Sequence, residues 1–161
     1  MNPCPCGHHG VRGAECICPP QAVRRYATRL SGPLRDRIDI ELSVMRVTAA
    51  RATEGEPASC ASVDARRRVL AARARAAARW QGSPWRRNAE VSGTWLRQGA
   101  FRLAPATRAP LDRALERGAL TLRGYDRVLR VAWTMAGLAG VERPGPDEVG
   151  GALYLKRGVA S

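Results

Sequence analysis

The chain has 161 residues, of which 45% are hydrophobic and 25% charged. This composition is typical of a soluble globular protein with one ordinary domain or two small ones. No window approaches eighteen uninterrupted apolar residues, which excludes a membrane-spanning helix, and the N-terminal residues lack the pattern of a secretory signal. We therefore expect a cytoplasmic protein with no membrane contact, in a compartment where clustered cysteines serve as metal ligands more often than as disulfides.

The formal net charge is +13, which favours a polyanionic partner such as DNA, RNA or a nucleotide phosphate. A second interpretation stays open, because nearly every basic residue is arginine and Lys156 is the only lysine. Abundant Arg, Ala, Gly and Pro are also what a GC-rich genome produces without selection for binding. Charge alone does not separate these two interpretations.

Four cysteines stand in the first eighteen residues as two Cys-x-Cys pairs. Four thiolates close a tetrahedral zinc site that is structural, since no coordination position stays open for catalysis. His8 or His9 would be able to replace one thiolate, and a different metal or unliganded cysteines are the alternatives. The predicted metal ligands are Cys4, Cys6, Cys16 and Cys18.

After the cysteine loop, the pattern of apolar residues predicts a helix over 21–30, ended by Ser31-Gly32-Pro33. Residues 38–44 alternate apolar and polar side chains, which predicts a strand with one buried face. Residues 48–60 have no periodicity and form a predicted linker, in which Cys60 stands alone.

The remainder of the chain predicts a small helical bundle. A narrow apolar stripe predicts a helix over 62–82, residues 84–103 are ambiguous, and a short helix is expected over 110–118. Residues 121–138 carry the strongest helical periodicity, and a last helix begins near Gly145-Pro146-Asp147.

Basic residues recur on one face of the helix predicted over 121–138. Arg123, Arg127 and Arg130 lie at positions i, i+4 and i+7, where like charges repel and a bound anion would relieve the repulsion. Arg123 is in the first turn, near the positive end of the helix. The alternative is a solvated face with Asp126 as a partner. Arg37 also has two interpretations. It forms a surface ion pair with Asp36 or Asp39, or it is an arginine that points toward a phosphate.

Several kinds of catalytic machinery are missing from these 161 residues. There is no Gly-x4-Gly-Lys-[Ser/Thr] phosphate loop and no acidic strand end of the Walker B type. The two histidines both lie in the cysteine loop, so no Ser/His/Asp arrangement is suggested. Taken alone, the chain shows no means of hydrolysing a nucleotide.

Four segments together resemble a known family. They are Met1 to Gly7 (MNPCPCG), Cys16 to Pro19 (CICP), Leu30 to Asp39 (LSGPLRDRID) and Tyr125 to Ala132 (YDRVLRVA). These segments are similar to the C-terminal part of the magnesium-chelatase-like AAA+ ATPases of the ComM/YifB type. The resemblance implies a ring-forming homo-oligomer that uses ATP and Mg2+, and for the competence branch it implies action on DNA.

The resemblance also implies roles for individual residues. Asn2 matches the sensor-1 position that orients the attacking water, and Arg37 matches the arginine finger that reaches the phosphate held by the adjacent subunit. Arg123 matches sensor 2, with Arg127 and Arg130 as weaker candidates. The cysteine loop is implied to be a zinc-stabilised insertion. The sequence departs from the family pattern at Arg35, where an apolar residue is usual, and at Trp133, where an arginine is usual.

These observations predict an α/β remnant of an AAA+ core at 1–47 with a Cys-rich insertion, a linker at 48–60 and an all-α lid at 61–158, mainly α overall. We expect a C-terminal fragment of such an ATPase that is inactive alone, because the phosphate loop is missing. Two alternatives remain, a stand-alone zinc-containing nucleic-acid-binding module and part of a metal-chelatase subunit.

Overall fold

The computed structural model describes residues 1–11, 13–42, 44 and 61–157, which divide into two compact units, Met1–Arg37 and Ile38–Ser161. The predicted linker at 48–60 lies outside the described residues. Every regular element in the described part is helical, and none of these helices combines the length and apolarity needed to cross a bilayer. In chain order the elements are α1 (Pro20–Ala27), α2 (Gly32–Asp36), α4 (Ser62–Arg79), η1 (Asn88–Glu90), α5 (Gly93–Arg97), η2 (Gly99–Phe101), α6 (Pro105–Glu116), α7 (Leu122–Ala139) and α8 (Pro146–Arg157).

The first unit consists of the cysteine loop followed by two short helices. Helix α1 begins at Pro20, close to its predicted start, because proline fits the first helical position, where no backbone donor is needed. Helix α1 ends at Ala27, before the predicted end at Leu30, and the Ser31-Gly32-Pro33 segment that predicts a helix end instead begins α2, with Pro33 in the first turn. Proline therefore marks a helix start here rather than a helix end.

The strand predicted over 38–44 is wrong for the described residues of that range, which have no strand structure. A strand needs the backbone of a neighbouring strand, and none of the described segments supplies one. Instead the Glu41 amide donates to the Leu155 carbonyl at 2.8 Å, and Lys156 Nζ donates to the Ile38 carbonyl at 2.7 Å. The segment is thus held against the end of α8. The α/β core remnant expected at 1–47 is accordingly helix and loop in its described part.

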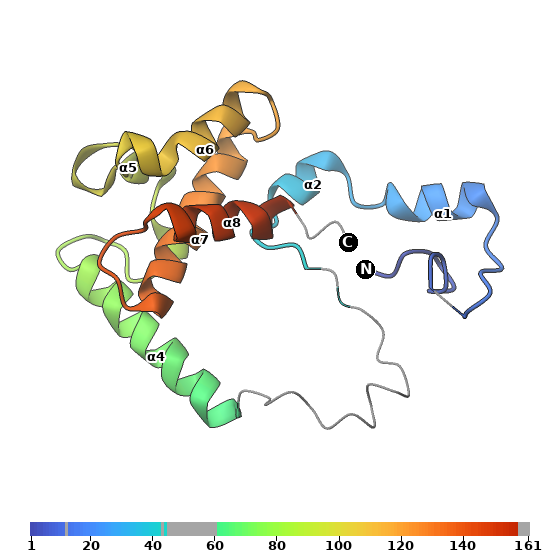
Figure 1. Ribbon diagram of the computed structural model, residues 1–161, viewed down its shortest axis with the longest axis horizontal. Helices are drawn as coiled ribbons and strands as arrows, with labels where there is room; N and C mark the ends of the chain where they lie inside the picture. The colour runs from blue at the N-terminus through green and yellow to red at the C-terminus, as the bar shows by residue number, and fades with distance from the viewer. Residues whose placement is uncertain (12, 43, 45–60, 158–161) are drawn as a thin grey trace. The chain divides into compact units, whose positions relative to one another are not determined.

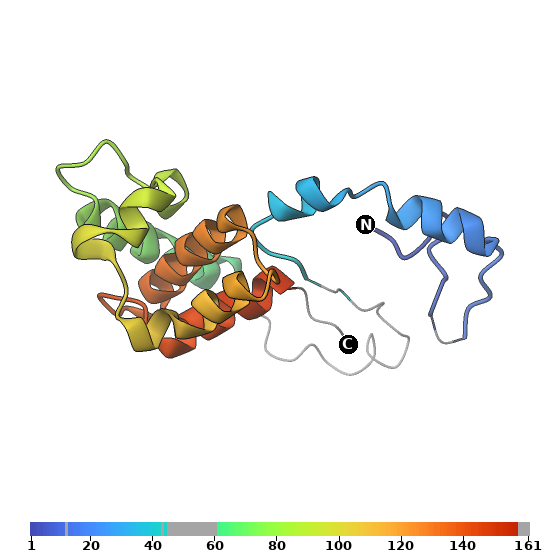
Figure 2. The ribbon, with the colours of Figure 1, turned by 90° about the horizontal axis from the view of Figure 1, so that it is seen from above.

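Helix α7 lies in the middle of the second unit, with α4 and α8 packed against it (Figure 1, Figure 2). Thr121 caps its start by accepting a hydrogen bond from the Gly124 amide at 3.0 Å, and Gly140 ends it with a φ of 80°. These bounds confirm the strongest helix predicted from the sequence. Its buried residues form two adjacent stripes, and within each stripe they recur every four positions. The buried residues are Gly124, Tyr125, Val128, Leu129, Ala132, Trp133, Ala136 and Gly137.

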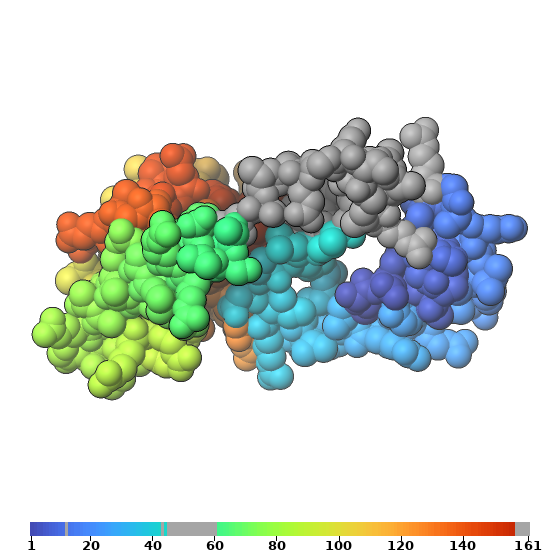
Figure 3. Space-filling view, turned by 90° about the horizontal axis from the view of Figure 1, so that it is seen from below, coloured from blue at the N-terminus to red at the C-terminus, as the bar shows by residue number. Residues whose placement is uncertain are grey.

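Helix α4 contributes to the core only through its C-terminal end. Ala76 and Trp80 are buried, whereas Val69 on the predicted apolar stripe is 42% exposed. In Figure 3 α4 forms much of the visible surface of the second unit. The predicted helix over 62–82 is therefore confirmed, but only the last part of its stripe is covered.

A buried polar network joins α4, η1 and α7. The Asn88 side chain accepts from Trp80 Nε1 at 2.9 Å and donates to Thr134 Oγ1 at 3.0 Å, and Thr134 in turn donates to the Arg130 carbonyl at 2.9 Å. Asn88 is 8% exposed, and among the described residues it is the only polar or charged residue in the buried core. Its amide is satisfied on both sides, as a buried polar group must be.

Helix α6 begins five residues before the predicted start at Pro110. Pro105 stands in its first turn, and Pro110 lies inside the helix. An interior proline removes one backbone hydrogen bond, so the sequence favoured a start at Pro110. The burial of Leu111 and Ala114 against the core offsets this local cost.

Gly93, at the start of α5, lies directly against α7. A Cβ at this position would stand 1.8 Å from Asp126 Oδ2, and the Asp126 carboxylate is already paired with Arg97. Only glycine, which has no side chain, allows α5 to approach α7 this closely.

We predict that Gly93→Ala destabilises the second unit by about 1–3 kcal/mol, because the new methyl group must displace Asp126 from Arg97. The matched control is Gly150→Ala on α8, where an added Cβ meets nothing within 4 Å. That change is expected to be neutral or to stabilise by up to about 1 kcal/mol through helix propensity. Urea denaturation followed by circular dichroism measures both. Equal stability of the two variants would contradict the close approach.

Candidate functional site

The cysteine loop gathers all four predicted ligands around one point. The four Sγ atoms lie within 4.8 Å of one another, with Cys4 to Cys6 at 3.3 Å and Cys16 at 3.7 Å from both. The loop turns back through a hydrogen bond from the Gly7 amide to the Cys4 carbonyl at 3.0 Å, and Gly7 has a φ of 81°. A glycine suits this left-handed turn between the two cysteine pairs.

This geometry fits a tetrahedral metal ion. Sulfurs about 2.3 Å from a zinc ion would stand about 3.8 Å apart, close to the separations of the thiols here. The Cys4 and Cys6 sulfurs are farther apart than the about 2.05 Å of a disulfide, and all four cysteines are free. The residues present therefore form a site able to hold one metal ion with four sulfur ligands.

The local electrostatics differ among the thiols. Burial alone would raise the pKa of Cys4, but hydrogen bonds from the His9 amide and neighbouring thiols outweigh it and lower the pKa to about 6. For Cys16 the backbone hydrogen bond at Cys18 lowers the pKa, but burial, the thiols of Cys6 and Cys4 and the negative charge of Cys4 outweigh it and raise the pKa to about 11. The lowered pKa favours the thiolate form of Cys4, which is the form that binds metals.

Asn2, the predicted sensor, precedes this loop. Its side chain is exposed, and its amide nitrogen lies 3.7 Å from the position a Cβ would take on Gly7. Arg37, the predicted finger, follows the last residue of α2 and is also exposed. Both residues belong to the first unit.

The three predicted phosphate-binding arginines all lie on α7 in the second unit, in different surroundings. Arg123 is exposed in the first turn. Arg127 Nη1 donates to Asp39 Oδ1 at 2.6 Å, and Arg130 Nε donates to the Val91 carbonyl at 2.9 Å. The expected partner Asp126 pairs instead with Arg97. Of the three, Arg123 has the most accessible guanidinium, since the other two are half-buried.

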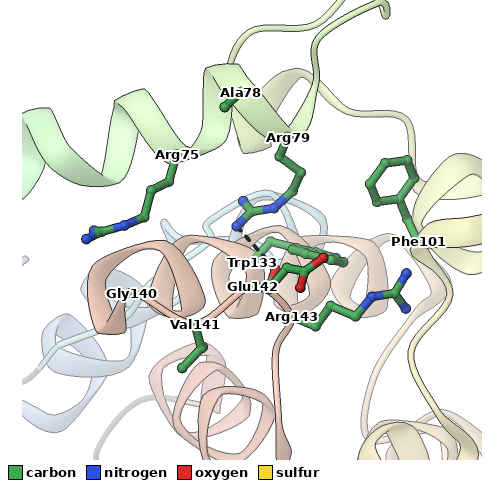
Figure 4. A pocket seen from close by; sticks show the side chains of 9 residues that line it. All are labelled: Arg75, Ala78, Arg79, Phe101, Trp133, Gly140, Val141, Glu142 and Arg143. Carbon is green, nitrogen blue, oxygen red and sulfur yellow. Dashed lines mark hydrogen bonds between the residues drawn. The ribbon is translucent and has the colours of Figure 1, made fainter.

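Sequence reasoning missed a second group of arginines, which lie around Trp133. Figure 4 shows Arg75 and Arg79 extending from α4 toward α7, and Arg143 reaching from the loop after α7 toward Phe101. Arg79 lies over the Trp133 ring, with its guanidinium carbon 4.7 Å from the ring centroid. No sequence motif marks this group, because Arg143 lies more than fifty positions after Arg75 and Arg79 in the chain.

Comparison with known proteins identifies the family. Residues 1–52 match the family described as "Magnesium chelatase, subunit ChlI", and residues 59–156 match "Magnesium chelatase, subunit ChlI C-terminal". The second match alone covers more than half of the chain. The chain therefore belongs to the magnesium-chelatase-like family, as the sequence motifs predicted.

Individual relatives agree with this assignment. The chain is 46% identical over 156 residues to "Uncharacterized protein Rv2897c" of Mycobacterium tuberculosis, 97% of this chain and 30% of the relative. It is 32% identical to YifB of Escherichia coli over 84% of this chain and 26% of the relative, and 29% identical to "Competence protein ComM" of Haemophilus influenzae over 89% and 27%. The chain thus spans less than a third of the length of these relatives.

We predict that the purified chain carries about one metal ion bound by the cysteine loop, measured by elemental analysis. A Cys4→Ser/Cys16→Ser double variant removes half of the ligands and should lose the metal. Cys60→Ser is the matched control, because it removes a thiol that is not among the four predicted ligands. A folded wild-type chain without metal, or a double variant that keeps it, would refute the site.

Proposed function

We propose that this chain is the C-terminal part of a magnesium-chelatase-like AAA+ ATPase that couples ATP hydrolysis to the remodelling of DNA. The family match over both of its segments is the observation that carries the proposal. In this proposal the phosphate-binding loop and the Mg2+ ligands lie in a region of polypeptide outside these 161 residues. The chain contributes the groups that sense the γ-phosphate and the helical lid.

Arg37 is proposed as the arginine finger. A guanidinium is always charged and presents several N–H groups in a fixed plane, which suits it to a phosphoryl group in the transition state. The exposed position of Arg37 at the end of α2 supports this role, because a finger must reach a nucleotide held by an adjacent subunit of a ring. Asn2, also exposed, is proposed to orient the attacking water.

Arg123 is proposed as the lid's sensor of the nucleotide phosphates. It lies in the first turn of a long helix, where the helix dipole also favours an anion, and its side chain is exposed. Arg127 and Arg130 are weaker candidates, because each already donates to a protein acceptor. We propose that they mainly hold α7 in place.

The metal of the cysteine loop is proposed to be a structural Zn2+. Four thiolates satisfy a tetrahedral zinc ion completely, so no position is left for a catalytic water. The ion would fix the loop between Asn2 and α1 and so hold the predicted sensor in place.

DNA is proposed as the macromolecular partner. One relative carries the name "Competence protein ComM", and the net charge of +13 here suits a polyanion. The parent ATPase is proposed to act as a homo-oligomeric ring, since an arginine finger acts on a neighbouring subunit's nucleotide.

We predict that replacing the equivalent of Arg37 by Ala in full-length Escherichia coli YifB abolishes ATP hydrolysis and spares ATP binding. An arginine finger typically supplies about 10³–10⁵-fold in rate, because it neutralises charge that develops in the transition state. Phosphate release measures the first property and nucleotide titration the second. Retained turnover in the finger variant would refute the assignment.

We also predict that this chain by itself binds ATP too weakly for isothermal titration to detect at micromolar concentrations. The chain lacks the backbone cradle and lysine that hold the β- and γ-phosphates. A micromolar dissociation constant would contradict the proposed division of the nucleotide site.

A further inference from the structure

A hollow of the described second unit lies between α4, the end of α7 and the loop that follows α7 (Figure 4). It encloses about 490 Å³, a volume suited to one nucleotide or a ligand of similar size. Three arginines and one glutamate line it, together with two aromatic rings. The residues that matter for recognition are Arg75, Arg79, Phe101, Trp133, Glu142 and Arg143.

Each of these arginines is fixed at one end by a backbone carbonyl. Arg75 donates to Gly137 at 2.8 Å, Arg79 donates to Glu142 at 3.5 Å, and Arg143 donates to Ala100. A guanidinium has five N–H donors, so each arginine keeps further donors for a ligand. These hydrogen bonds restrict the three side chains before any ligand arrives, which lowers the entropy cost of binding.

Among the described residues that line the hollow, positive charge exceeds negative charge. Three guanidinium groups face one carboxylate, that of Glu142. Burial lowers the pKa of Arg79, while the charge of Glu142 raises it in part, so the guanidinium is held in a setting that disfavours its charge. A bound anion would offset this cost.

A second hollow of about 340 Å³ adjoins the first, because Phe101 lines both. Trp95 forms its other wall and is 45% exposed, an unusual degree for so large an aromatic side chain. Its ring lies stacked on Phe101, with centroids 5.7 Å apart and planes at 21°. Arg143 bridges the two hollows through its hydrogen bond to Ala100, which lines the second.

From these features we propose that the two hollows form one groove that binds single-stranded DNA. Bases would stack on the exposed part of the Trp95 ring, since Phe101 is already packed against Trp80, Trp95 and Trp133. Phosphates would lie against Arg75, Arg79 and Arg143. Stacking platforms flanked by positive charge are the usual way in which proteins hold single strands without reading sequence. A duplex is disfavoured, because its bases are already stacked and cannot reach Trp95. The inference rests on the proposed function only in naming DNA as the source of the strand.

The test measures binding of a short fluorescein-labelled oligothymidylate to the full chain by fluorescence anisotropy. An Arg75→Gln/Arg143→Gln double variant should weaken binding about tenfold or more. The magnitude of the salt slope should fall by about 1.4, since each phosphate contact of a single strand contributes about 0.7. Arg113→Gln/Arg117→Gln is the matched control, with the same loss of charge at exposed residues of the α6 end, and should change affinity less than twofold.

The stacking surface is tested separately. Trp95→Ala should weaken oligothymidylate binding about tenfold, whereas Trp95→Phe keeps an aromatic face and should restore most of the affinity. Thermal unfolding of both variants shows whether the fold is intact. If Trp95→Ala unfolds the chain, quenching of tryptophan fluorescence in the wild type by the same oligonucleotide replaces it as the readout.

Three outcomes would overturn the inference. Equal losses in the groove and control variants would mean that charge acts diffusely, and equal affinity for a matching duplex would remove the role of stacking. No binding of the oligothymidylate at low salt would exclude the groove outright. None of these measurements uses ATP. The groove proposal and the finger assignment in the full-length relative are therefore tested independently, and either one can be refuted while the other holds.

Discussion

The buried side chain of Asn88 joins the parts on which the second unit depends. Its oxygen accepts from Trp80 at the end of α4, and its nitrogen donates to Thr134 on α7. Trp80 in turn packs against Phe101 and Trp133, with ring centroids 4.6 and 6.0 Å away. A buried amide that lost one of these partners would cost about 1–3 kcal/mol, so this network strongly favours a single arrangement of α4 on α7. That arrangement also places Arg79 over the Trp133 ring and Arg75 against the Gly137 carbonyl.

The first unit has no comparable core. Of its described residues only Cys4 is buried, and the helices α1 and α2 bury none of their side chains. A segment of this size cannot bury enough apolar surface to order itself by that means alone. A metal ion held by four thiolates would provide the missing cross-link, which gives the cysteine loop a structural reason in addition to its geometry.

The arginines of the second unit fall into distinct physical settings. Arg97, Arg127 and Arg130 donate to protein acceptors and hold α7 to its neighbours. Arg123 is exposed at the start of α7, where an anion is favoured. The arginines around Trp133 lie between these extremes, because they are anchored and yet line a hollow. A large positive charge therefore does not by itself indicate that an anion is bound, since some of the arginines stabilise the packing of α7.

The sequence alone determined the features that depend on local order along the chain. The spacing of Cys4, Cys6, Cys16 and Cys18 indicated one cluster, and the periodicity of residues 121–138 indicated the central helix. The motifs around Cys4, Arg37 and Tyr125 identified the family. Tertiary contacts decided the rest. The alternating residues 38–44 have the pattern of a strand, but the contact with Leu155 and Lys156 replaced the partner that a strand requires. The hollow beside Trp133 could not be predicted, because Arg75, Phe101 and Arg143 line it together only when α4, η2 and the loop after α7 pack around Trp133.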